Sequence, residues 1–210
     1  MKKAVAILIF AFVLAGCMAQ SSEMVSLPSP HKQGGKPLMQ ALNERHSTRQ
    51  YVEKDLNDQQ LSDLLWAAYG INRQDGKRTA ASANNKQEVD IYLATSKGVF
   101  FYNALENELK KISSDDLREQ TGRQPFVKTA ALNLIYVVNK NKASGNDDRS
   151  KLICGSICIG SISQNVYLYC ASEGLGSVVR AMVDKDKLAG ILKLNSDQEI
   201  VLTQTVGFVK

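Results

Sequence analysis

One long apolar stretch, from Ser150 to about Glu173, limits the folds open to this chain more than any other feature. It has helical spacing, and about 24 residues at 1.5 Å each give a helix of ~36 Å. A helix that is apolar on every face must be buried on every face. A chain of 210 residues can bury such a helix internally, and a symmetric dimer can bury it equally well. Its large residues are Ile153, Ile157, Ile159, Ile162, Val166 and Leu168, and its small ones are Gly155, Ser156, Gly160, Ser161 and Ser163.

The remaining pattern mixes helices with strands. Asn57 and Gln60 form a capping pattern ahead of an apolar helix that stops at Gly70. A Lys97-Gly98 turn between two apolar runs predicts a hairpin. Without regular βαβ alternation, the fold class is α+β, with a mostly antiparallel central sheet packed by helices. Helices are predicted at 38–45, 57–70, 103–120, 124–131 and 184–192, and strands at 89–93, 99–102, 132–138, 177–179 and 200–208.

The amino terminus reads as an export signal. Lys2 and Lys3 precede an apolar run that ends in Leu14-Ala15-Gly16-Cys17. This ending is similar to a bacterial lipoprotein signal, so residues 1–16 are predicted to be a signal peptide with Cys17 lipidated. The alternative is an ordinary signal peptide whose cysteine is incidental. We expect residues 17–36 to form a flexible polar tether, residues 37–210 to form the folded domain, and the protein to be anchored to a membrane of the cell envelope.

Composition excludes several function classes. The net charge of +5 falls to about +3 once Lys2 and Lys3 leave with the signal peptide, and no basic stripe with interleaved aromatics suggests nucleic acid. With two histidines in the chain, a metal site is not expected. Cys154, Cys158 and Cys170 are an odd number, and we expect them to be small core residues. No nucleophile or P-loop motif is present, which disfavours hydrolysis.

A cationic cluster, Arg45-His46-Ser47-Thr48-Arg49, is the strongest candidate for a binding site. A guanidinium group pairs with phosphate oxygens through two parallel charge-assisted hydrogen bonds, and a serine hydroxyl can add a third. The segment therefore suits the phosphate of a bound cofactor. The plainer interpretation, a solvated basic helix end, stays open on this segment alone.

Four segments in order together resemble the nitroreductase family of flavin enzymes. The cationic cluster is similar to the family's R-[RH]-S-x-[RK] opening, and the chain from Leu65 to Gln87 is similar to A-x-G-x-N-R followed by R-T-[AP]-P-S-A-x-N-x-Q. The other two segments run from Gln164 to Ser177 and from Thr205 to Phe208. Two departures are present: Ala81 stands where the family has proline, and many relatives continue past the final V-G with a further basic phosphate ligand. Either Lys210 fills that role, or Arg45 and Arg49 mainly hold the phosphate and the affinity for the cofactor is weaker.

The resemblance implies a nitroreductase-like fold, FMN as cofactor, and a homodimer with two flavins at the interface, where the long helix lies. It implies a ping-pong oxidoreductase that passes electrons to nitroaromatic, quinone or similar small acceptors, with no catalytic acid or base because the flavin carries the chemistry. NAD(P)H is not expected outside the cytoplasm, so the electron donor stays open. A non-catalytic, flavin-binding or ligand-carrying lipoprotein is the alternative. The implied cofactor-binding residues are Arg45, His46, Ser47, Arg49, Ser82, Asn85, Gln87, Gly174, Leu175 and Gly176.

Overall fold

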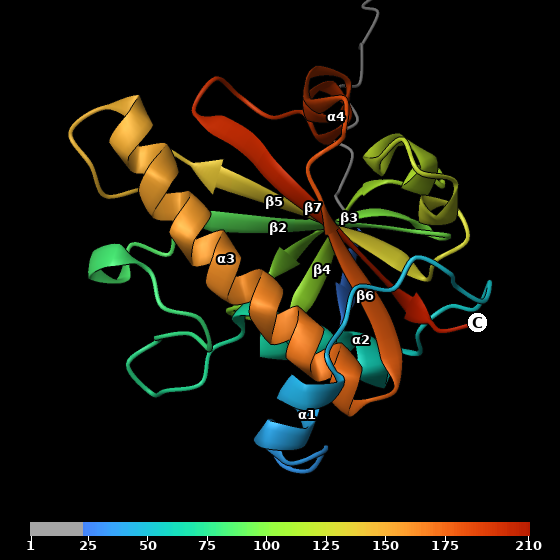
Figure 1. The fold of residues 1–210 in the computed structure, drawn as a ribbon. Helices are drawn as coiled ribbons and strands as arrows, with labels where there is room; N and C mark the ends of the chain where they lie inside the picture. Colours follow the sequence, from blue (N-terminus) through green and yellow to red (C-terminus); the bar gives the residue numbers. More distant parts are fainter. Residues whose placement is uncertain (1–22) are drawn as a thin grey trace, which may run out of the picture.

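A seven-stranded sheet forms the centre of the molecule, in a computed structural model that describes residues 23–210. The strand order is β1-β4-β3-β2-β5-β7-β6, and each of the six neighbouring pairs is antiparallel. Figure 1 shows the helices packed around this sheet, which confirms the α+β prediction. The strands are β1 (Met24–Ser26), β2 (Val89–Thr95), β3 (Gly98–Asn103), β4 (Glu108–Ser113), β5 (Leu132–Asn139), β6 (Leu175–Arg180) and β7 (Gln198–Phe208).

The predicted long helix is α3 (Asp148–Ser172), and it begins with a capping box between Asp147 and Ser150. One face of α3 is buried against the sheet, where a Cβ added to Gly155 would run into the side chain of Val138. The opposite face is open: Ile153 is 51% and Ile157 is 68% exposed. Burial on every face is therefore not achieved within one chain. The buried residues of α3 are Gly155, Cys158, Ile159, Ile162, Ser163, Val166 and Cys170.

Three shorter helices complete the two layers: α1 (Leu38–Glu44), α2 (Asp58–Tyr69) and α4 (Lys185–Leu192). The predicted capping box of α2 is present, since Asn57 accepts from the Gln60 amide at 2.8 Å and Gln60 accepts from the Asn57 amide at 3.1 Å. Helices α2 and α3 cover one face of the sheet and bury the larger core cluster. On the other face, α4 packs through Leu188 and Leu192 onto a second cluster.

Two predicted helices are wrong. Residues 103–120 form β4 and a 3-10 turn, Arg118–Thr121, because a tight turn with Asn107 at φ 53° sends the chain back along β3. Residues 124–131 contain only a 3-10 turn, Pro125–Val127. The first error arises because pairing with a neighbouring strand is not visible in local periodicity.

The predicted tether also differs from the structure. Residues 23–36 follow the domain surface: β1 pairs with β4, the Leu27 amide donates to the Asn107 carbonyl at 3.1 Å, and Ser62 Oγ donates to the Pro28 carbonyl at 2.5 Å. The physical reason is that β4 would otherwise be an edge strand with unpaired backbone groups, and β1 satisfies them. The predicted signal peptide at 1–16 and lipidation at Cys17 lie outside the described residues.

Candidate functional site

The segment after α1 lies across the end of the sheet next to β6 and β7. The Thr48 amide donates to the Ser177 carbonyl at 2.9 Å, and the Val52 amide donates to the Phe208 carbonyl at 2.9 Å. Ser47 and Ser177 also form an isolated parallel bridge. The fold thus brings the cationic cluster, residues 45–49, beside residues 174–177, which include three of the predicted cofactor-binding residues, although more than a hundred residues separate the two segments in sequence.

The two arginines of the cluster carry charge that the described part of the chain does not neutralise. Between residues 23 and 210, no carboxylate lies within ion-pair distance of Arg45 or Arg49. The adjacent acid, Glu44, is already engaged: Lys36 Nζ donates to it at 2.6 Å and Gln40 Nε2 at 2.7 Å. The hydrogen bond from Lys36 is the main reason that the pKa of Glu44 lies below its usual value. Two guanidinium groups are therefore left for an external anion.

Tyr167, on α3, connects the parts of the cluster. Its ring centroid lies 5.2 Å from Arg45 Cζ, its Oη lies 3.2 Å from Ser47 Oγ, and the same Oη accepts from the Val179 amide at 2.8 Å. The sequence prediction missed this residue, because a tyrosine on an apolar helix is usually a core residue. The available signal was its place inside the Gln164–Leu168 motif. His46, by contrast, is exposed and its Nδ1 lies 2.8 Å from the Glu44 carbonyl.

Gly174, just before β6, and Gly176, within it, have different roles. Gly174 adopts φ +70°, and a Cβ added there would meet no atom within 4 Å, so this side of the turn is open to a ligand. A Cβ on Gly176 would instead lie 2.8 Å from Thr48 Cβ and Cγ2. The missing side chain of Gly176 lets Thr48 approach β6. Leu175 is 6% exposed and its side chain belongs to the core.

The second predicted group, Ser82, Asn85 and Gln87, belongs to a loop that holds its own shape. Ser82 Oγ accepts from the Gln87 amide at 2.9 Å, Arg78 Nε donates to Gln87 Oε1 at 2.8 Å, and Gln87 Nε2 donates to Asn85 Oδ1 at 3.2 Å. Asn84, Asn85 and Gln87 have φ of 51°, 53° and 50°. Left-handed backbone at non-glycine residues costs energy and is concentrated at functional sites. The Gln87 side chain supports the loop, while Asn85 is exposed.

The two groups do not meet within one chain. Figure 1 shows the 72–87 loop on one side of α3 and the segment that follows α1 on the other. Among residues 23–210, no hydrogen bond joins this loop to residues 45–49 or 174–176. A single protomer therefore presents half of the predicted site on each side of α3.

The carboxyl end of the chain reaches the cationic cluster. The Lys210 amide donates to the Gln50 carbonyl at 3.4 Å, and Tyr51 pairs with Val209 in an antiparallel bridge. Lys210 therefore lies opposite Gln50, the residue that follows Arg49.

The described chain contains no candidate metal site and no disulfide beside the cationic cluster. No group of three or more His, Cys, Asp or Glu side chains could hold a metal ion between residues 23 and 210. The three described cysteines are free. Burial raises the pKa of the Cys158 thiol to about 11, and its Sγ donates to Tyr69 Oη at 3.5 Å.

This fold is found in known proteins. The chain belongs to the nitroreductase family, whose model matches residues 42–208. It is similar to a crystal structure from Ralstonia eutropha JMP134 assigned as a nitroreductase, with 38% identity, 91% of each chain covered and a TM-score of 0.84. It is 26% identical over 167 residues to MJ1384 of Methanocaldococcus jannaschii, also assigned as a nitroreductase, covering 75% of this chain and 84% of that protein. The NADPH:FMN oxidoreductase of Vibrio harveyi shares the fold, with 18% identity, a TM-score of 0.62, and 82% and 69% of the two chains covered.

Proposed function

We propose that this protein is an FMN-dependent oxidoreductase that passes electrons by a ping-pong mechanism to nitroaromatic, quinone or similar small acceptors. Membership of the nitroreductase family makes it a flavin oxidoreductase, and FMN is the cofactor of that family. The observation that carries the proposal is the pair of guanidinium groups, Arg45 and Arg49, without acidic partners in the described chain. A dianionic phosphate supplies the charge that they lack.

The residues of the cationic cluster fit a phosphate in number and kind. Arg45 and Arg49 provide forked donors, Ser47 provides a hydroxyl, and the Lys210 side chain adds an ammonium from the neighbouring strand. Gly174 leaves an open approach beside this group. When bound, FMN supplies the electron-transfer chemistry, and the chain's own residues bind, orient and shield it.

The Ser82–Gln87 loop completes the site from a second copy of the chain. Ile153 and Ile157 of α3, and Leu38 and Met39 of α1 at 63% and 75% exposure, are apolar side chains that one protomer leaves exposed. A two-fold dimer across α3 buries these side chains and brings the loop of one protomer toward the cationic cluster of its partner. Asn85 then contacts the flavin from the partner's side.

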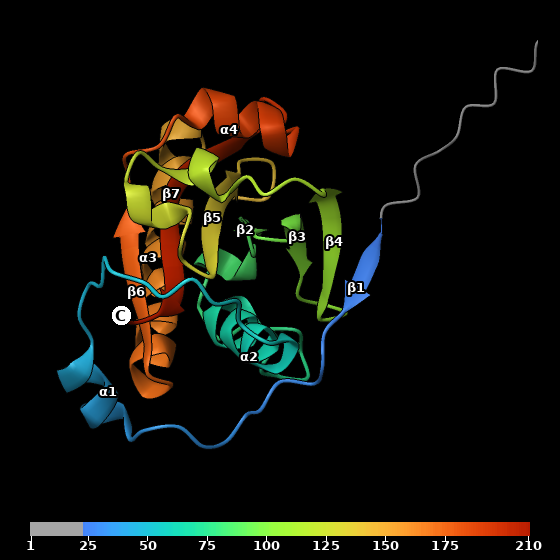
Figure 2. The same cartoon turned by 90° about the vertical axis from the view of Figure 1, so that its right-hand side faces the viewer.

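The test is FMN binding by three proteins: the native chain, Arg45→Ala with Arg49→Ala, and Lys185→Ala with Lys187→Ala. The last pair removes two exposed cations from α4, which lies at the far end of the molecule from α1 in Figure 2, and so controls for net charge. Loss of two charged hydrogen-bonding groups at about 1.5–3 kcal/mol each weakens FMN binding by at least a hundredfold. If the two α4 substitutions weaken FMN binding equally, the loss reflects the net charge of the protein and not a phosphate site at Arg45 and Arg49. A native protein that binds no FMN would refute the proposed function.

Turnover separates the catalytic function from the non-catalytic alternative. Dithionite-reduced protein is mixed anaerobically with a nitroaromatic or a quinone, and reoxidation of the flavin is followed by absorbance. We expect complete reoxidation. Tight FMN binding without reoxidation would favour a flavin-carrying protein that only keeps the fold.

We also propose that the chain is exported and held at a membrane through a lipid on Cys17. At that location the flavin is reduced by an electron donor other than cytoplasmic NAD(P)H. The support is the sequence pattern Leu14-Ala15-Gly16-Cys17. Mass spectrometry of the amino-terminal peptide from the native host, compared with Cys17→Ala, tests this. An unmodified Cys17 would overturn the anchoring.

A further inference from the structure

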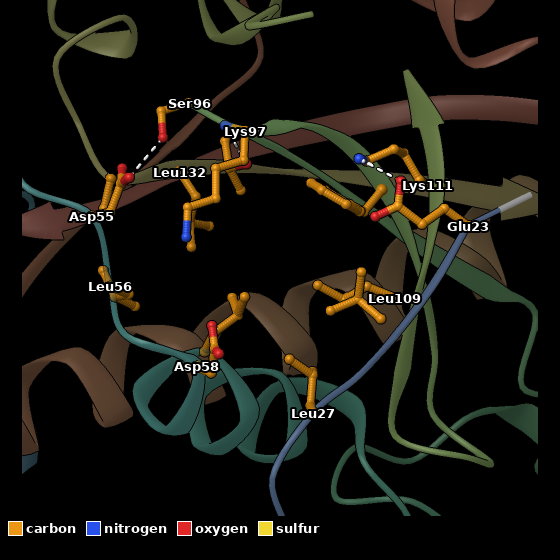
Figure 3. Close-up of a pocket in the computed structure, with 15 residues that line it drawn as sticks. Glu23, Leu27, Asp55, Leu56, Asp58, Ser96, Lys97, Leu109, Lys111 and Leu132 are labelled. Carbon is orange, nitrogen blue, oxygen red and sulfur yellow. Dashed lines mark hydrogen bonds and ion pairs between the residues drawn. The ribbon is translucent and has the colours of Figure 1, made fainter. Parts of the chain in front are cut away.

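A cavity that is partly open to solvent lies at the β1 edge of the sheet. Its volume is about 270 Å³, and it sits between α2, the faces of β3, β4 and β5, and the amino-terminal strand β1. Figure 3 shows the hollow with its apolar side chains turned inward. None of the ten predicted flavin-binding residues lines it. Its apolar walls are Val25, Leu27, Leu56, Leu61, Phe100, Leu109, Ala131 and Leu132.

The protein's own side chains leave this hollow unfilled. Interiors are packed as densely as organic crystals and rarely keep empty spaces larger than a water molecule. An apolar cavity of about 150 Å³ stays dry and binds benzene, so in proportion this one holds a body of about eleven non-hydrogen atoms. Eight of the fifteen lining residues are apolar, and the other seven, among them Lys97 and Asp58, are polar or charged. The cavity therefore has room for a small molecule with an apolar body and a polar end.

The charged side chains at the rim of the cavity indicate which charge the polar group of a ligand would carry. Lys111 Nζ is paired with Glu23 at 2.8 Å, and Asp55 accepts from Ser96 Oγ at 2.7 Å. Lys97 has no carboxylate within ion-pair distance in the part of the chain described, and in Figure 3 its side chain extends toward the hollow. Asp58, the remaining acid, occupies the first turn of α2, where the helix dipole stabilises a negative charge. The cation left for a ligand is the Lys97 ammonium.

We propose that this cavity binds a medium-chain fatty carboxylate, with the hydrocarbon chain against α2 and the sheet and the carboxylate on Lys97. An eight-carbon chain matches the volume, whereas a long-chain fatty acid exceeds it. Val25 of β1 and Leu27, just after this strand, line one wall, so the amino-terminal segment forms part of the site. This site is independent of the flavin cluster.

Titration calorimetry of the full chain with octanoate, and with 1-octanol as the uncharged match, tests the assignment. We expect submillimolar octanoate binding, weaker binding of octanol and no binding of hexadecanoate. Lys97→Gln should weaken octanoate binding about threefold to fivefold, as expected for an exposed ion pair, and leave octanol unchanged. Asp58→Asn should strengthen octanoate binding slightly, because it removes one of the two lining carboxylates, Asp55 and Asp58, that have no cationic partner in the described chain.

A variant that fills the cavity controls for binding elsewhere. Leu61→Trp places an indole in the hollow from α2 and should abolish binding of both ligands. If circular dichroism shows that this variant is unfolded, Leu61→Phe adds less volume and should still weaken both ligands. Undetectable octanoate binding to the native chain, equal octanoate affinity in Lys97→Gln, or unchanged binding in a folded cavity-filling variant would each overturn the proposal. FMN content should stay constant throughout, so neither result bears on the flavin site.

Discussion

Replacement of Tyr167 by Phe tests whether this residue organises the cationic cluster. The change removes one oxygen and keeps the ring that lies under Arg45. In the native protein that oxygen accepts from the Val179 amide at 2.8 Å and lies 3.2 Å from Ser47 Oγ. A neutral hydrogen bond contributes about 0.5–1.5 kcal/mol. The loss at Val179 lowers the stability of the domain, and the loss at Ser47 frees a side chain of the cluster.

We therefore expect two separable effects of Tyr167→Phe. The free energy of unfolding, measured in urea, should fall by about 1 kcal/mol, and the Kd for FMN, measured by fluorescence quenching, should rise about fivefold. Tyr167→Leu also removes the ring, and with it a cation–π contact of about 0.5–1 kcal/mol, so FMN binding should weaken further.

Tyr169→Phe is the matched control on the same helix. Its hydroxyl donates to the Gln60 carbonyl at 3.3 Å, away from the cluster. This variant should lose similar stability and keep the native affinity for FMN. The reasoning is wrong if Tyr167→Phe binds FMN like the native protein, or if Tyr169→Phe weakens FMN binding equally.

Three further outcomes are expected. Gly155→Ala should destabilise the domain by about 1–3 kcal/mol because the new Cβ meets Val138. In a double-mutant cycle, the destabilisation of Gly155→Ala with Val138→Ala should be at least about 0.5 kcal/mol smaller than the sum of the two single destabilisations. The side-chain hydrogen bond from Arg118 holds the pKa of Asp116 below its usual 3.8. Asp116→Asn should then lower the unfolding free energy at neutral pH by no more than about 1 kcal/mol, since the carboxylate is 36% exposed, and the difference from the native protein should vanish as the pH falls through the lowered pKa. Ile157→Asp should convert a dimer into a monomer on gel filtration and release FMN, whereas a dimer that persists would place the interface elsewhere.

Local signals were sufficient for the elements whose stability is local. The capping box at Asn57 and Gln60, the hairpin around Lys97-Gly98 and the length of α3 could all be predicted from spacing and residue type. Strands β1 and β4 could not, because each exists through pairing with a distant partner. Met24 faces Lys110 across 86 residues of sequence, and short polar segments carry little strand signal of their own.

The candidate site shows the same division. The Arg45–Arg49 segment was visible as a concentration of charge, and the fold places it beside residues 174–177 as the resemblance implied. Tyr167 was not predicted, because its contacts with Ser47 and Val179 depend on how α3 crosses the edge of the sheet. The position of the Ser82–Gln87 loop on the other side of α3 was equally hidden, since sequence order says nothing about which face a long loop takes.

The order of strands in the sheet determines how far the amino-terminal strand lies from the cationic cluster. The described chain enters at β1, one outer strand, and the cationic cluster lies beside β6, the other outer strand, six spacings or about 29 Å away along the sheet. If the proposed lipid on Cys17 holds the protein at a membrane, the described chain leaves the attached segment at the edge of the sheet opposite the cluster. Electron donors and acceptors would then reach the cationic cluster from solution, because the membrane anchor would not cover the β6 edge of the sheet.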